Sequence, residues 1–95
     1  MIDSVEKEVD MLKRHLEVLQ MVVEHEPIGI VKMSNQSGYA HHEVRYSLRK
    51  LEEADLIDPS QQGAVTTTQT TPFIETLGEQ INDIRTRVTA MESLK

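Results

Sequence analysis

YAHHEVRYSLRKLEEADLI, residues 39–57, predicts one amphipathic helix whose two sides need different partners. Val44, Leu48 and Leu51 fall at positions i, i+4 and i+7, so they lie on one line of a helix and must be buried. The residues largely off that line carry hydrogen-bond donors, a phenol and permanent positive charge: His41, His42, Arg45, Tyr46 and Arg49. Such groups suit an acidic partner, because Arg bonds bidentately to guanine and Tyr or His reaches phosphates and base edges.

The segment before this helix predicts a second, shorter helix at residues 30–37. Ile30, Val31 and Met33 are available to a core, and Gly38 is a good stop because glycine accepts the left-handed conformation that ends many helices. Two helices joined by a short turn that contains glycine make a helix-turn-helix.

The segment after the helix predicts a chain reversal and a β-hairpin. Asp55 stands at the reversal, since Asp tolerates unusual backbone angles better than most residues. Residues 57–59 and 64–69 can pair across the polar turn at residues 60–63. No Lys or Arg occurs from Leu51 to Ile84, so a hairpin here would meet DNA through neutral Gln and Thr side chains or not at all.

Two strings in this region, VRYSLRKLEEADLI and DPSQQGAVTTT, carry a family resemblance. Residues 28–69 resemble the winged helix-turn-helix transcriptional regulators, the class that includes the ArsR and MarR families and many small archaeal regulators. Asp55 departs from the glycine usual in that class. The resemblance implies that residues 41–54 form the recognition helix, which enters the major groove of double-stranded DNA, and that residues 57–69 form the wing.

The two ends of the chain predict long helices with narrow apolar seams. Their apolar residues alternate at spacings of three and four, the pattern of a and d positions in a coiled coil. A seam this narrow favours helix-on-helix pairing, so we expect a dimer interface at Val5, Val9, Leu12, Leu16, Leu19, Ile74, Leu77, Ile81, Ile84, Val88 and Met91. Pairing of the two helices within one chain is the alternative, and it would leave a monomer.

Local signals set the expected boundaries. Asp3 and Glu6 have the spacing of a capping box, and Pro27 ends the first helix. Thr71 can cap the last helix, with Pro72 at its first position. The chain is therefore expected to be one winged-helix domain made of an N-terminal helix (1–26), a helix-turn-helix with wing (28–69) and a C-terminal dimerisation helix (71–95).

Composition limits the possible functions. The 95 residues suit one small domain, and the absence of cysteine excludes disulfides, thiolate metal sites and Cys nucleophiles. No window approaches the apolar length of a membrane span, so we expect a cytoplasmic protein without membrane contact. The net charge of −6 is unusual for a DNA-binding protein, but residues 41–50 are locally basic and most acids lie in the terminal segments.

Catalysis, metals and cofactors find no support in the sequence. Known catalytic motifs and Gly-rich phosphate loops are missing. His41 and His42 are neighbours that point about 100° apart on a helix, so they do not chelate a metal. We therefore expect no enzyme, no cofactor and no metal site, and the sequence leaves a small-molecule effector open.

The sequence thus predicts a mainly α protein with a small β-hairpin wing, acting as a homodimeric, sequence-specific regulator on double-stranded DNA. Arg45 and Arg49 are the expected base or phosphate contacts, and Lys32 and Lys50 are expected on the DNA backbone. The alternative is a winged-helix module that docks on another protein without binding DNA.

Overall fold

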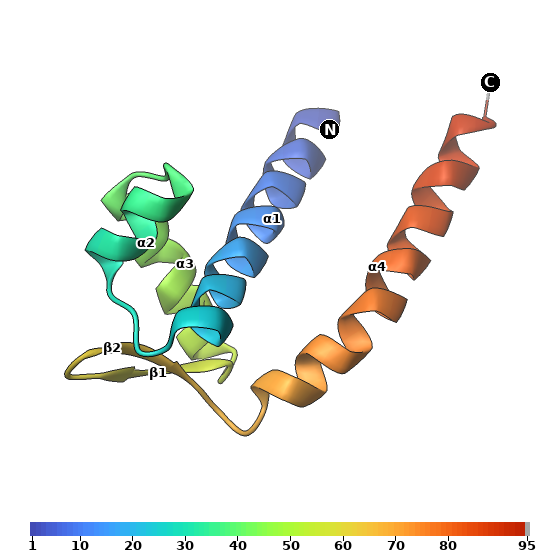
Figure 1. Ribbon diagram of the computed structural model, residues 1–95. Helices are drawn as coiled ribbons and strands as arrows, with labels where there is room; N and C mark the ends of the chain where they lie inside the picture. The colour runs from blue at the N-terminus through green and yellow to red at the C-terminus, as the bar shows by residue number, and fades with distance from the viewer. Residues whose placement is uncertain (95) are drawn as a thin grey trace.

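The computed structural model describes residues 1–94. Four helices and one hairpin follow one another in the order α1 (Ile2–His25), α2 (Ile30–Ser37), α3 (His41–Glu53), β1 (Ile57–Ser60), β2 (Gly63–Thr66) and α4 (Thr70–Glu92). The molecule is elongated, with extents of 53 × 28 × 21 Å, because α1 and α4 both project from one end of a compact unit (Figure 1). The predicted fold class, mainly helical with a small hairpin between long terminal helices, is confirmed.

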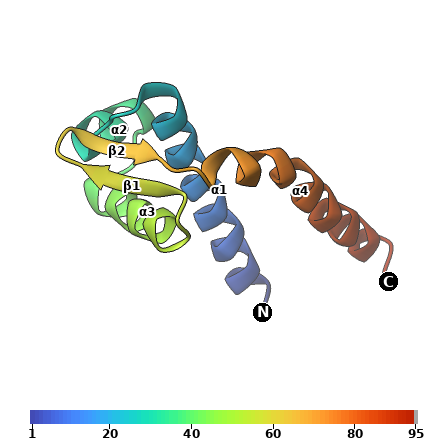
Figure 2. The ribbon, with the colours of Figure 1, turned by 90° about the horizontal axis from the view of Figure 1, so that it is seen from below.

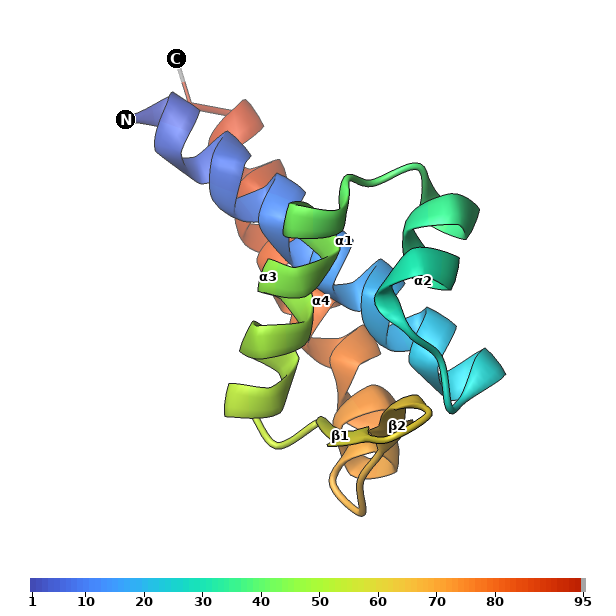
Figure 3. The ribbon, with the colours of Figure 1, turned by 90° about the vertical axis from the view of Figure 1, so that its left-hand side faces the viewer.

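The turn between α2 and α3 is built as the sequence predicts. Gly38 ends α2 with a φ of 81°, and its N–H donates to the Ser34 carbonyl over 2.9 Å. Figure 3 shows α2 and α3 joined by this short turn beside α1. Tyr39 ties the turn to α1, since its hydroxyl donates to Glu17 Oε1 over 2.7 Å. One prediction is wrong: Val31 is 61% exposed, because it lies on the outer side of α2 while Met33 fills the core.

Helix α3 begins after Ala40, which has no side-chain acceptor, and one half of a capping box compensates for this. Glu43 Oε1 accepts the Ala40 N–H over 3.0 Å. At the other end, Asp55 takes a φ of 60°, which is the left-handed backbone expected there. Both ends of α3 are therefore set by local chemistry.

The hairpin pairs Ile57 with Thr66 and Ser60 with Gly63, and it is antiparallel. Its strands pack against α3 and α1, and Figure 2 shows the hairpin from below. Ile28, just after α1, adds a short bridge to Ala64 through hydrogen bonds of 3.2 and 2.8 Å. The approach is so close that a Cβ on Gly63 would lie 2.5 Å from the Ile28 backbone. The second strand ends at Thr66 rather than at Gln69, because the following threonines form the turn into α4.

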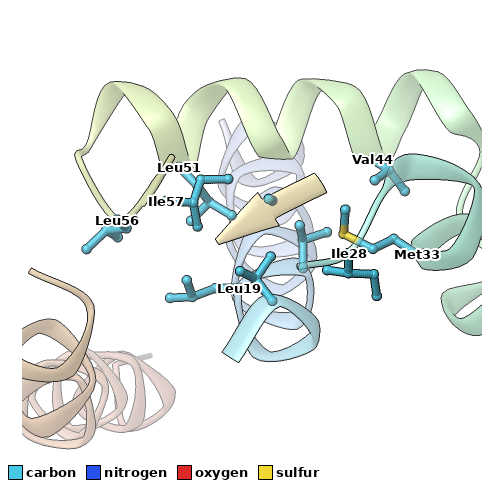
Figure 4. Packing of buried hydrophobic residues seen from close by; sticks show 10 residues of the cluster. Leu19, Ile28, Met33, Val44, Leu51, Leu56 and Ile57 are labelled. Atoms are coloured by element: carbon cyan, nitrogen blue, oxygen red, sulfur yellow. The ribbon is translucent and has the colours of Figure 1, made fainter. Parts of the chain in front are cut away.

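The core lies where α1, α3 and the hairpin meet (Figure 4). Its most buried members come from every element except α4: Val18, Leu19, Val22, Ile28, Met33, Val44, Leu51, Leu56, Ile57 and Ala64. Val44 and Leu51 are buried as predicted, and Leu48 is half-buried against this cluster. Only the second half of α1 enters the core, so its first half forms an arm.

Threonine hydroxyls attach α4 to the compact unit. The buried Thr70 Oγ1 donates to the Leu56 carbonyl over 2.7 Å, and Thr67 Oγ1 donates to the Asp55 carbonyl over 2.7 Å. The helix begins at Thr70, so the predicted cap at Thr71 is wrong. The predicted capping box at Asp3 is also wrong, because α1 begins at Ile2 without a side-chain cap.

Candidate nucleic-acid interface

The outer side of α3 presents cationic groups to solvent. Arg45 and Arg49 are exposed, as are His41 and His42 in the first turn. Among the residues described, neither guanidinium lies within 4.0 Å of a carboxylate. Because no carboxylate of the described residues neutralises them, both arginines are available to an external anion.

The two lysines expected to contact the DNA backbone differ in their surroundings. Lys32 is exposed on α2, without an ion pair inside residues 1–94. Lys50 lies 3.6 Å from Glu53 Oε2 and 5.6 Å from the centre of the Tyr46 ring. The Lys50 ammonium therefore already interacts with two side chains of α3.

Tyr46 is half-buried and lies among cations. The guanidinium carbon of Arg49 lies 5.3 Å from the centre of its ring, and that of Arg14, from α1, lies 5.9 Å from it. The His15 ring is also close, with its centre 5.9 Å from that of Tyr46. The ring is thus held between α1 and α3, and it supports the two guanidinium groups by cation–π attraction.

Sequence reasoning missed the residues that fix α3 against α1. Ser47 is fully buried, and its hydroxyl accepts the Arg14 Nε–H over 2.9 Å. His15 Nδ1 lies 2.7 Å from the same oxygen, and Arg14 Nη1 reaches Glu43 Oε2 at 3.5 Å. A polar cluster therefore connects the two helices at one edge of the apolar core.

The environment disfavours the charged form of His15. Burial lowers the pKa of His15 below its usual 6.5, and the charges of Arg14 and Lys50 lower it further, against a small opposite effect of Glu8. The direction of the His15 hydrogen bond depends on the tautomer: when Nδ1 carries no proton, the Ser47 hydroxyl donates to His15 and accepts from Arg14. In that tautomer each polar atom of this contact has a hydrogen-bond partner.

Two signals in the sequence point to this cluster. Ser47 is three residues after Val44 and four before Leu51, so it lies on the buried line of its helix although it is polar. Arg14 precedes Val18 by four residues, which places it on the face of α1 that enters the core. A polar residue on each of two facing apolar lines indicates a hydrogen-bonded contact.

The apolar seams of the terminal helices remain largely uncovered. Val5, Val9, Leu12, Ile74, Ile84, Val88 and Met91 are exposed, and Leu16, Leu77 and Ile81 are half-buried. Leu19 differs, because it is only 2% exposed and packs into the core of its own chain. A groove of about 440 Å³ lies between the two helices, lined by Val5, Val9, Leu12 and Ile84.

Across residues 1–94, no helix is long and apolar enough to cross a membrane.

A helix-turn-helix followed by a β-hairpin, with the second helix exposed on its outer side, defines a winged helix-turn-helix fold. A search of solved structures finds the same fold in MarR of Staphylococcus aureus, solved in complex with salicylate and kanamycin. The match has a TM-score of 0.59 and 19% sequence identity, and it covers 87% of this chain. The chain spans 59% of the length of that MarR chain.

No family model matches the sequence, and the search of curated proteins gives no match either. At 19% identity, the likeness to MarR establishes the fold. Function must therefore be argued from this chain's own residues.

Proposed function

We propose that this protein is a homodimeric, sequence-specific transcriptional regulator that places α3 in the major groove of double-stranded DNA. The observation that carries the proposal is the free state of Arg45 and Arg49 on the outer side of the second helix of a helix-turn-helix. This is the helix that reads base edges in proteins of this architecture, and arginine is the side chain that most often bonds to guanine there.

The net charge of −6 is compatible with this role because of where the acids lie. Asp3, Glu6, Glu8 and Asp10 lie on the projecting half of α1, and Glu75, Glu79, Asp83 and Glu92 lie on α4. The two helices extend away from the hairpin (Figure 2). Glu8 still acts on His15 beside α3, but the charges near the free ends of the two helices are screened within about 8 Å at physiological salt.

The exposed seams on α1 and α4 support the dimer. In the described structure, α1 and α4 are separated toward their free ends, and the seam residues that line the groove between them are exposed to a second copy (Figures 1 and 2). Full burial of a half-exposed aliphatic side chain contributes roughly 1 kcal/mol. Several such residues on each helix therefore supply a substantial driving force for association, and light scattering should give twice the 10.8 kDa mass of one chain.

Duplex binding across a salt titration tests the proposal. A library of random duplexes would supply the preferred site, and the affinity for that site should fall steeply as salt rises. The Arg49→Ala variant should lose about 1 to 3 kcal/mol if Arg49 reads a base. The matched control is the double variant Arg85→Ala/Arg87→Ala on α4, which removes the same charge as Arg45→Ala/Arg49→Ala. Because these residues flank the seam, both double variants are compared at a concentration where light scattering gives the same mass for each. Binding by a folded Arg45→Ala/Arg49→Ala protein that equals the control would refute the proposal.

A protein-docking module is the second candidate, and the hairpin is the observation that favours it. Gln61 and Gln62 are exposed at its tip, and no Lys or Arg lies on either strand. A docking module would show no duplex affinity even at low salt, whereas a regulator would bind most tightly there.

A further inference from the structure

A concave surface of about 460 Å³ lies where α1 and α3 meet, and it includes a residue that a helix-turn-helix alone would not supply. Its lining is Arg14 from α1 together with His42, Glu43, Arg45, Tyr46 and Arg49 from α3. Arg14 thus stands on the same surface as the two arginines proposed to contact DNA. The concavity therefore spans the projecting helix and the recognition helix.

The fixed charges of this concavity are unbalanced. It holds three guanidinium groups and one carboxylate. Both oxygens of that carboxylate are engaged, since Glu43 Oε2 pairs with Arg14 at 3.5 Å and Oε1 accepts the Ala40 N–H at 3.0 Å. Two positive charges, on Arg45 and Arg49, therefore remain without a counterion among residues 1–94.

Two of the guanidinium groups lie near the Tyr46 ring. Arg14 and Arg49 each lie within 6 Å of the centre of the same ring, at 5.9 and 5.3 Å. Both arginines line the same concavity, and an anion with several acceptor oxygens seated there would reduce the repulsion between their charges. Arg14 keeps donors for such an anion, because Nε and Nη1 are the nitrogens used by Ser47 and Glu43, while Nη2 has no hydrogen-bond partner among residues 1–94.

We propose that this concavity seats one phosphodiester group of the bound duplex, held by Arg14 and Arg49 beside the Tyr46 ring. The inference rests on the proposed function and adds α1 to the DNA-binding surface. A phosphate contact carries no sequence information, but it fixes the register and orientation of the reading helix. Arg14 would then set the depth and angle at which α3 enters the groove.

The test compares Arg14→Gln with Lys13→Gln, an exposed neighbour that removes the same charge and does not line the concavity. A dimer carries two copies of the site, so Arg14→Gln should lower the slope of log K against log salt by about 1.8, and affinity should fall roughly fivefold or more. The Lys13→Gln variant should stay close to the wild type. Circular dichroism melting would establish that both variants are folded.

Because Arg14 also supports Ser47, a second variant separates a phosphate contact from a structural role. Glu43→Gln removes the carboxylate that competes for Arg14 and keeps an oxygen that can accept the Ala40 N–H. A phosphate seat predicts tighter duplex binding by Glu43→Gln, because one negative charge beside the phosphate is removed. A purely structural role predicts equal or weaker binding, and that result would overturn the inference.

The remaining comparisons identify which proposal fails. A wild-type protein that binds no duplex would refute the proposed function itself. A wild-type protein that binds duplex, with an unchanged salt slope in Arg14→Gln, would refute only the phosphate seat. Inorganic phosphate, titrated against chloride at equal ionic strength, tests the source of the anion. Free phosphate could raise the melting temperature of the wild type but not of Arg14→Gln, while the salt dependence of duplex affinity is the same in both proteins. That result would assign the site to a small phosphorylated ligand, and the duplex assignment would be wrong.

Discussion

Replacing Ser47 with Ala removes one oxygen atom and should lower the free energy of unfolding substantially. Ser47 is fully buried and accepts a hydrogen bond from the charged Arg14 side chain over 2.9 Å. It also bonds to His15 over 2.7 Å. Alanine leaves both partners without that oxygen while the helix persists, because alanine is the better helix former.

The magnitude follows from these contacts. A hydrogen bond to a charged group contributes about 1.5 to 3 kcal/mol, and a neutral one about 1 kcal/mol. The gain in helix propensity returns roughly 0.5 kcal/mol, and the partial exposure of Arg14, whose side chain is 15% accessible, lets water replace part of the lost bond. We expect Ser47→Ala to lower the free energy of unfolding by about 2 kcal/mol.

Urea unfolding at a fixed protein concentration measures this loss, with the signal followed by circular dichroism. The midpoint should fall by about 1 M, since small proteins lose roughly 1 to 3 kcal/mol of stability per molar urea. Ser93→Ala is the matched control, because Ser93 is exposed and its hydroxyl donates only to the Ala90 carbonyl. If Ser47→Ala were as stable as this control, the cluster around Ser47 would not stabilise the contact between α1 and α3.

Three further outcomes are expected. Burial holds the pKa of His15 below that of the unfolded chain, so the unfolded state binds the proton first and the free energy of unfolding should fall as the pH falls below about 6.5. His15→Gln should make the free energy of unfolding less dependent on pH, and an unchanged dependence in urea melts from pH 7.5 to 5 would contradict this. Val88→Asp places a charge on the seam and should yield monomers in light scattering, whereas Thr86→Asp, on the opposite side of α4, should leave the dimer intact. Dimers in both variants would exclude the seam as the interface. Gly63→Ala should cost about 3 kcal/mol, because its φ is 132° and its Cβ would meet the Ile28 backbone at 2.5 Å; a melting temperature equal to that of the wild type would show that the hairpin shifts without cost.

The sequence predicts the helix-turn-helix well because its signals are local. Gly38 and Asp55 adopt the left-handed backbone for which their residue types are suited, and they mark the ends of α2 and α3. Val44 and Leu51 fix the inner side of α3 by spacing alone. Each of these predictions needs only neighbours within a few residues.

The remaining features depend on contacts between distant residues. Arg14 and Ser47 are 33 residues apart, so no local rule pairs them. Helix α4 begins at Thr70 because its hydroxyl reaches the Leu56 carbonyl, 14 residues earlier, whereas the local pattern favours a cap at Thr71. The outer position of Val31 likewise follows from how α2 packs, since an eight-residue helix leaves its rotation undecided by sequence.

Helix α1 joins the two halves of the proposed mechanism. Its second half lies in the core through Val18 and Val22, and its first half carries the exposed seam proposed for the dimer. Arg14 and His15 lie at the border between these halves, where Ser47 of α3 is bonded to both. An α-helix is stiff over this length, so a dimer formed through α1 would fix the positions of both α3 helices, and with them the half-site separation of about 34 Å that successive major grooves require. A change at the Arg14 contact would then alter both the affinity for one half-site and the preferred spacing of two, whereas loss of Arg45 would alter the first alone.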